Sequence, residues 1–305
     1  MLHYSMLYLI VAIIILSTLI FFSPSMLQAQ EHDYYLNPKF VSDAFDNTFD
    51  VFKSPLHWES NNWLKAGIFT GSAILLYAYD RQMQNFVQEH KSDFITSLTD
   101  ATNYLGNGYF VLSAEALLYC YGHIASDEKA RRISLEMLES FAVVGVTVTG
   151  LKMLTHRHRP STSDSPDIWD GPSFSSHNIA FPSGHAAVAF SWATVFAEEF
   201  SEKPIVGIVS YTLAACTAFS RVYKNKHWVS DVFVGALLSH VITKKIVSLH
   251  AEKDQNSITI NPGFFVSIFQ FFQNSHSIFL QQGKLLSQQK GWHHLLCNAY
   301  QLEIP

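Results

Sequence analysis

The sequence has few charged residues and few cysteines. Only 15% of its 305 residues are charged, whereas about a quarter is usual in soluble globular proteins. The three cysteines, Cys120, Cys216 and Cys297, are odd in number and widely spaced, which excludes a disulfide framework and a cysteine zinc site. The net charge of −5 argues against a protein that binds nucleic acid through a basic domain. In such an apolar chain, a local cluster of basic side chains stands out.

The N-terminus carries an uncharged apolar run at residues 6–22. The polar stretch SPSMLQAQ follows, in which Ala29 is a small residue suited to a cleavage site. Residues 1–29 are therefore predicted to be a secretory signal peptide or an uncleaved membrane anchor. Both alternatives place the protein in a cell envelope, and we expect a bacterial one.

The rest of the chain is organised as apolar segments of helical length. Residues 30–63 form a polar and aromatic lead-in, predicted to be a loop with short helical turns. Six segments follow, separated by glycine and proline: 66–79, 108–124, 135–151, 186–197, 205–219 and 232–247. This pattern predicts an all-α fold, a bundle of about six helices that forms one domain at residues 64–250. The tail at 251–305 has no clear period and is assigned no role.

Basic side chains are concentrated where the third apolar segment ends. The stretch KMLTHRHRP holds Lys152 and Arg159, which are two helical turns apart and lie near one face of a helix. Between them, His156, Arg157 and His158 are interpreted as structural or solvent-facing residues. The cluster either complements the dipole of the helix end or binds an anion held in a pocket.

A second stretch, FPSGHAAVAF, favours an anion site. Ser183 is a suitable N-cap for the helix that follows, and Gly184 allows the backbone to approach a ligand closely. His185 lies in the first turn, where free N–H groups and the helix dipole attract negative charge.

A third stretch, SRVYKNKHWVSD, adds a cation and an acid–imidazole pair. Arg221 is followed by His227 and by Asp231, and the last two are four apart, so that they share a face of a helix. A carboxylate in that position can fix the imidazole tautomer. If consecutive helices run antiparallel, all three stretches meet and build an active site at one end of the bundle. Three cations, a helix N-terminus and two histidines suit a phosphoryl group.

The three stretches together resemble the type 2 phosphatidic acid phosphatase (PAP2) superfamily. Its pattern is Lys, six residues and Arg-Pro; then Pro-Ser-Gly-His; then Ser-Arg, five residues, His, three residues and Asp. The resemblance implies that His227 is a nucleophile that forms a phosphohistidine, that Asp231 orients it, and that His185 is the general acid. It also implies a set of residues that bind the phosphate: Lys152, Arg159, Ser183, Gly184 and Arg221.

The function implied by this resemblance is that of a metal-independent phosphatase without a cofactor. We expect it to hydrolyse a phosphomonoester or pyrophosphate of a lipid, such as phosphatidic acid, phosphatidylglycerophosphate, an isoprenyl pyrophosphate or lipid A phosphate. A small soluble phosphoester is an alternative substrate. Two other functions are considered: a vanadate-dependent haloperoxidase, which the family resembles in its pocket, and a non-catalytic lipid-binding membrane protein.

Cations at the opposite end of the predicted bundle indicate its orientation. That end gathers Lys129, Arg131, Arg132, Lys203, Lys244 and Lys245. The positive-inside rule places such an end in the cytoplasm, so we expect the active site to face the periplasm. We also expect the protein to be membrane-associated or periplasmic. Beyond residue 22, no segment reaches the about 18 uncharged apolar residues of a clear membrane span.

Overall fold

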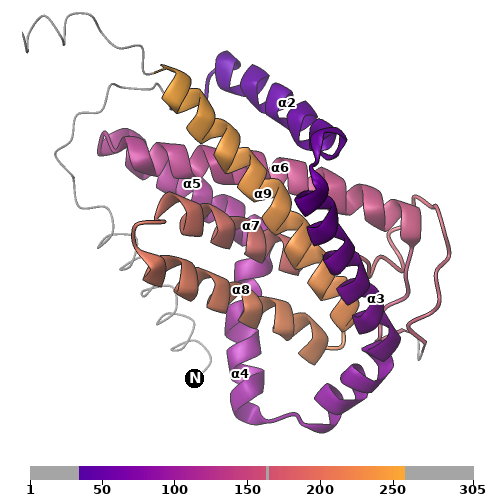
Figure 1. Ribbon diagram of the computed structural model, residues 1–305. Helices are drawn as coiled ribbons and strands as arrows, with labels where there is room; N and C mark the ends of the chain where they lie inside the picture. Colours follow the sequence, from indigo (N-terminus) through magenta and orange to yellow (C-terminus); the bar gives the residue numbers. More distant parts are fainter. Residues whose placement is uncertain (1–33, 163–164, 258–305) are drawn as a thin grey trace, which may run out of the picture. The chain divides into compact units, whose positions relative to one another are not determined.

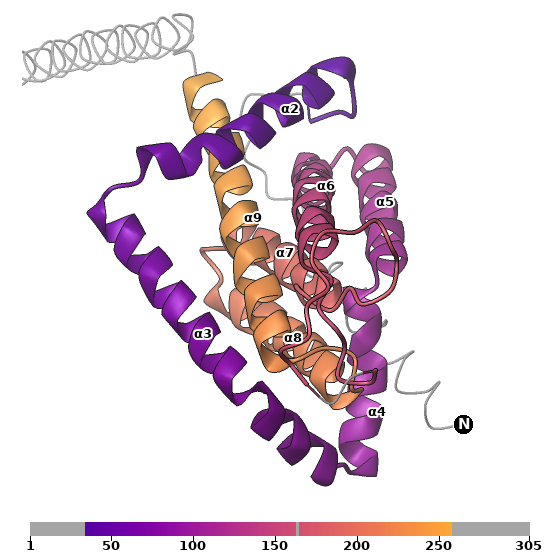
Figure 2. The ribbon, with the colours of Figure 1, turned by 90° about the vertical axis from the view of Figure 1, so that its right-hand side faces the viewer.

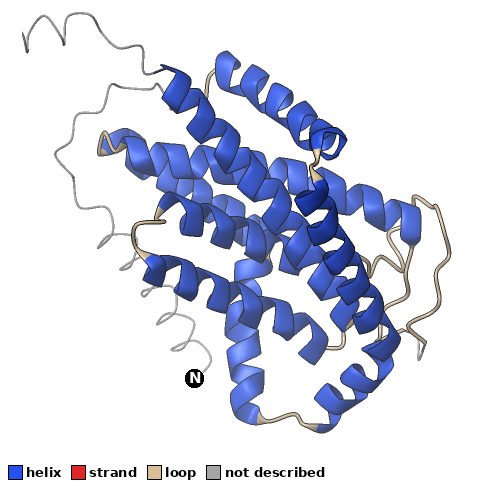
Figure 3. Cartoon of the chain, viewed as in Figure 1, coloured by secondary structure: helices blue, strands red, loops and turns tan. Residues whose placement is uncertain are grey.

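The computed structural model describes residues 34–162 and 165–257, so the predicted signal peptide or anchor lies outside the described residues, as does the tail from 258 onward. Within these ranges the chain forms α-helices and two short 3₁₀ helices, with no strand (Figure 3). The prediction of an all-α fold is confirmed. The α-helices are α2 (Pro38–Lys53), α3 (Ser60–Glu89), α4 (Asp93–Thr102), α5 (Gly108–Ile124), α6 (Glu128–Thr155), α7 (Gly184–Glu199), α8 (Pro204–Tyr223) and α9 (Val229–Ser257); the 3₁₀ helices are Ser54–His57 and Asn103–Gly106.

The helix α2 corrects the prediction of a loop with short turns at residues 30–63. Asn37 caps it, since its side-chain oxygen accepts a hydrogen bond from the backbone N–H of Phe40 at 2.8 Å, and Pro38 begins it. Asn47 and Val51 are buried on its inner side, while Phe45 and Phe49 are exposed. Composition alone suggested a loop because the segment is polar and aromatic.

The core of the bundle is built around α7, which packs against α6 and α8, while α5 packs against α6 (Figures 1 and 2). Buried alanines on α7, Ala186, Ala189 and Ala193, let the neighbouring backbones come close. Larger side chains, among them Val148 and Ile246, pack against another buried alanine of α7, Ala187. This packing fixes the N-terminus of α7 relative to its neighbours, and that terminus carries the PSGH stretch.

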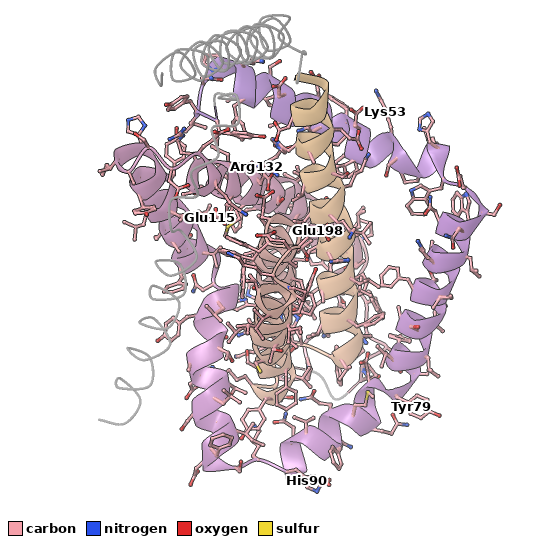
Figure 4. All side chains as sticks on the ribbon, turned by 60° about the vertical axis from the view of Figure 1, so that its left-hand side comes forward. Lys53, Tyr79, His90, Glu115, Arg132 and Glu198 are labelled. Atoms are coloured by element: carbon pink, nitrogen blue, oxygen red, sulfur yellow. The ribbon has the colours of Figure 1, made fainter. Side chains whose placement is uncertain are left out.

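Three helices are long and apolar enough to cross a membrane: α6, α8 and the part of α9 from Val229 to Asp254. The criterion of an uninterrupted uncharged run missed α6 because this helix contains Glu136 and Glu139. Both carboxylates are buried inside the protein, so they need not face lipid. Figure 4 shows other charged side chains, such as Glu115 and Arg132, also lying among the helices. These helices support membrane association.

Candidate active site

The PSGH stretch and the third stretch are joined directly through their backbones. The N–H of Ser183 donates to the carbonyl oxygen of Asp231 at 2.9 Å, and the Ser183 side chain caps α7 by accepting from the N–H of Ala186 at 3.5 Å. Gly235, one turn further along α9, lies directly beneath this contact. A Cβ atom at Gly235 would lie 2.5 Å from the carbonyl oxygen of Ser183. The close contact between α7 and α9 therefore requires glycine there.

His227 lies in the loop between α8 and α9 and is buried, with 3% of its surface exposed. Its Nδ1 atom is 2.7 Å from the carbonyl oxygen of Ala180. A carbonyl can only accept, so Nδ1 carries the proton and the lone pair is on Nε2. Burial lowers the pKa of His227 to about 4, and the charges of Lys152 and Arg221 act in the same direction. The ring is therefore neutral at physiological pH, as a nucleophile must be.

Asp231 lies beside His227 but does not form the hydrogen bond that was expected to orient it. Its Oδ2 atom is 3.8 Å from Nδ1 of His227 and accepts instead from the backbone N–H of Trp228 at 2.9 Å. Its Oδ1 atom accepts from Arg157 at 2.6 Å. The acceptor that fixes the tautomer is Ala180, and Asp231 supplies negative charge at slightly longer range.

The three predicted cations come together from the ends of α6 and α8, and all are half-buried. Lys152 donates to the carbonyl oxygen of Ile179 at 2.5 Å, and its Cε atom is 3.9 Å from the place of a Cβ atom at Gly184. Arg221 donates to the side chain of Asn103. The charge of Arg159 acts on both Lys152 and Arg221. This part of the cluster can surround an anion at the N-terminus of α7.

His185 is half-buried in the first turn of α7. The pKa of His185 is lowered to about 3, mainly by burial and also by the nearby charges of Arg221, His227 and Lys152. The backbone of His185 packs closely against Gly106. A Cβ atom at Gly106 would lie 2.7 Å from the carbonyl oxygen of His185, so only glycine fits there. An oxyanion bound among these cations would favour the protonated ring and raise the pKa again.

The structure thus brings together all eight residues that the sequence proposed for the site. Three further residues that contact them were not predicted as functional: Asn103, Arg157 and Ala180. Nor was Asp80, which contacts Arg157. Arg157 had been interpreted as structural or solvent-facing, and it is completely buried. Ala180 contacts His227 through its backbone carbonyl oxygen. Every residue type has this group, so the amino-acid sequence could not indicate the contact. Among the described residues, no three His, Cys, Asp or Glu side chains are grouped as metal ligands would be.

Part of the chain is similar in sequence to known proteins. Residues 134–254 match the model of the PAP2 superfamily, and this range includes every proposed site residue from Lys152 to Asp231. This part of the chain therefore has the sequence features of the PAP2 superfamily. Over 64 residues, the chain is 42% identical to the lipid A 1-phosphatase of Porphyromonas gingivalis. That alignment covers 21% of this chain and only 14% of the relative.

Two solved structures are also similar to this chain. One is a transmembrane PAP2 type phosphatidylglycerolphosphate phosphatase from Bacillus subtilis, with 20% identity, a TM-score of 0.48 and coverage of 60% of this chain and 94% of that one. The other is LpxE from Aquifex aeolicus, with 21% identity, a TM-score of 0.43 and coverage of 55% and 93%.

Proposed function

We propose that this PAP2 protein is a metal-independent phosphatase that hydrolyses a phosphorylated lipid through a phosphohistidine. One observation carries the proposal: a buried neutral His227, with its Nε2 lone pair free, lies beside three cations and the N-terminus of α7. Lys152, Arg159 and Arg221 supply the positive charge that a metal ion provides in other phosphatases.

The reaction proceeds in two displacements. The Nε2 lone pair of His227 forms a bond to phosphorus, the bond from phosphorus to the leaving oxygen breaks, and that oxygen takes a proton from His185. The phosphorylated ring keeps its Nδ1–H on Ala180 and is therefore positively charged. Water then attacks phosphorus and gives a proton to His185, and the N–P bond breaks to release phosphate and neutral His227.

An apolar cavity beside the site favours a lipid substrate. It has a volume of about 620 Å³ and lies between α3, α8 and α9. Val222 and Val229, which line it, flank the loop that carries His227. A hydrocarbon chain in this cavity would be removed from water, at about 0.8 kcal/mol for each buried CH₂ group, while its phosphate reached the cations.

The location that fits a lipid substrate is the membrane, with the site facing the periplasm of a bacterium. The three helices that are long and apolar enough to cross a membrane support the membrane location. The outward orientation rests on the cations at the end of the bundle far from the site, where Lys129 donates to the backbone carbonyl oxygen of Glu199 and Arg132 pairs with the carboxylate of Glu199.

Phosphate release by the full chain in detergent tests the proposed activity. We expect hydrolysis of at least one among phosphatidic acid, phosphatidylglycerophosphate, undecaprenyl pyrophosphate and lipid A phosphate, with kcat/KM above that for p-nitrophenyl phosphate. Activity should persist in EDTA, and vanadate should inhibit it. Loss in EDTA with recovery on added metal would reject the mechanism, and preference for the soluble ester would reject the lipid. Bromide oxidation by the vanadate-loaded protein would favour a haloperoxidase instead.

A further inference from the structure

Arg157 holds a buried ionic group behind the catalytic residues. Its side chain is completely buried and pairs with two carboxylates, through Nη2 with Asp80 at 2.7 Å and through Nη1 with Asp231 at 2.6 Å. Its guanidinium lies 4.8 Å from the ring centres of Tyr77 and Trp169, which keep it away from solvent. A guanidinium held in this way cannot reach a phosphate, so its effect on the reaction must pass through its partners.

Asp80 comes from α3, outside the range that matches the PAP2 model. It is fully buried, whereas its neighbour Tyr79 is 53% exposed and points outward (Figure 4). Besides Arg157, it accepts from the backbone N–H of Ser230 at 2.9 Å. Ser230 lies in the first turn of α9, next to Asp231, so Asp80 satisfies a free N–H group at that helix N-terminus. It therefore holds both Arg157 and the turn that carries Asp231.

The charge of this group matters because His227 becomes positive when phosphorylated. Two carboxylates and one guanidinium leave one net negative charge next to a buried ring that is otherwise faced by Lys152, Arg221 and His185. Without Asp80, Arg157 would neutralise Asp231 and nothing negative would remain beside the ring. At low dielectric, such a change acts strongly on charge that develops nearby.

We propose that Asp80 is a positioning residue that acts through Arg157: it holds Asp231 beside His227 and keeps the buried group negative, which stabilises positive charge on the imidazole ring. This inference rests on the proposed function, because it assigns a role in forming the phosphohistidine. The proposed role has two components, the net charge of the group formed by Asp80, Arg157 and Asp231 and the position of Asp231 beside His227. Experiment can separate the effect of charge from the effect of position.

The test compares Asp80→Asn with the double variant Asp80→Asn/Arg157→Gln, with Glu89→Gln as control. Glu89 is an exposed acid at the end of the same helix. Asp80→Asn, which keeps an acceptor for Ser230, should lower kcat by about 10- to 100-fold and change KM little, because the phosphate-binding cations are untouched. The double variant again has one net negative charge and should recover part of kcat. A kcat for the double variant below that of Asp80→Asn, or a single variant equal to wild type, would overturn the proposal.

A readout that does not depend on turnover separates this inference from the proposed function. The ring nitrogens of His227, followed by NMR in the full-length chain, report its pKa. Asp80→Asn should lower that pKa relative to wild type and relative to Glu89→Gln, and the double variant should raise it again. An unchanged pKa in folded Asp80→Asn protein would reject the inference even if the wild type is an active phosphatase. If Asp80→Asn fails to fold, Asp80→Glu, which keeps the charge, should retain the wild-type pKa; a lowered pKa there would equally reject it.

Discussion

The Nδ1 atom of His227 and the carbonyl oxygen of Ala180 are 2.7 Å apart, and this contact fixes which ring nitrogen can react. Since Nδ1 donates to a backbone carbonyl, a side-chain substitution at residue 180 cannot remove the acceptor. The tautomer of His227, the proposed nucleophile, is thus set by the path of the chain just before the PSGH stretch.

Replacing the nucleophile should abolish turnover. His227→Ala removes the nitrogen that attacks phosphorus, and we expect kcat to fall by roughly 10⁴-fold or more. The matched control is His177→Ala, at an exposed position in the loop before α7, which should keep the wild-type rate. Phosphate release by the two purified variants is the measurement. Turnover near that of wild type in His227→Ala would refute the assignment.

Asp231→Asn should reduce the rate without abolishing it. The amide oxygen can still accept from the N–H of Trp228, and Ala180 still fixes the tautomer, but the negative charge beside His227 is lost. We expect kcat to fall by about 10²- to 10⁴-fold, less than for His227→Ala. Single-turnover kinetics should locate the loss in the formation of phosphohistidine. An equal loss in both variants would show that Asp231 does more than supply charge.

Binding of a dianion should make the site take up a proton. The pKa of His185 is lowered to about 3 in the free site, so the ring is neutral at pH 6. A bound dianion favours its charged form and raises this pKa. Calorimetry of sulfate binding at pH 6, in buffers of different ionisation enthalpy, should show net proton uptake. His185→Ala should reduce that uptake, and an unchanged value would contradict the role of His185 as the acid.

Gly235→Ala should damage the site by sterics alone. The added methyl group would lie 2.5 Å from the carbonyl oxygen of Ser183, so α7 and α9 must separate. We expect a loss of about 1–3 kcal/mol in the free energy of unfolding together with a fall in kcat. The control is Gly145→Ala, on α6, where an added Cβ atom meets nothing within 4 Å; thermal melts and phosphate release compare the pair. Equal stability of the two variants would argue against the close contact.

The orientation of the site can be tested by labelling. A cysteine in place of Ser165, in the loop that precedes the PSGH stretch, should react with a membrane-impermeant thiol reagent once the outer membrane is permeabilised. The natural residues Cys120, Cys216 and Cys297 are removed first. A cysteine in place of Lys245, toward the other end of α9, is the control and should stay unlabelled. Labelling of residue 165 only after the inner membrane is broken would reverse the orientation.

The helices and the proposed site residues were predictable because their signals are local. Ser183 is an N-cap beside its own helix, and His227 and Asp231 are one helical turn apart. The helix α2 was missed because its segment is polar and aromatic, and only Asn47 and Val51 are buried while Phe45 and Phe49 are exposed. Asp80 was missed for another reason: it meets Ser230 across 150 residues of chain. In the sequence it is only an acid at the end of an apolar segment.

The pairing of Asp80 with Arg157 has a consequence for how such chains diversify. Losing the acid alone leaves a guanidinium that cancels Asp231, and losing the guanidinium alone leaves two buried carboxylates facing each other without a cation, which is strongly unfavourable. Loss of Asp80 alone or of Arg157 alone is therefore unfavourable, while loss of both residues together is tolerated far better. Among relatives that keep the three motifs, positions 80 and 157 are therefore expected to vary together. A fragment trimmed to residues 134–254 would keep every motif residue and still lack half of this pair.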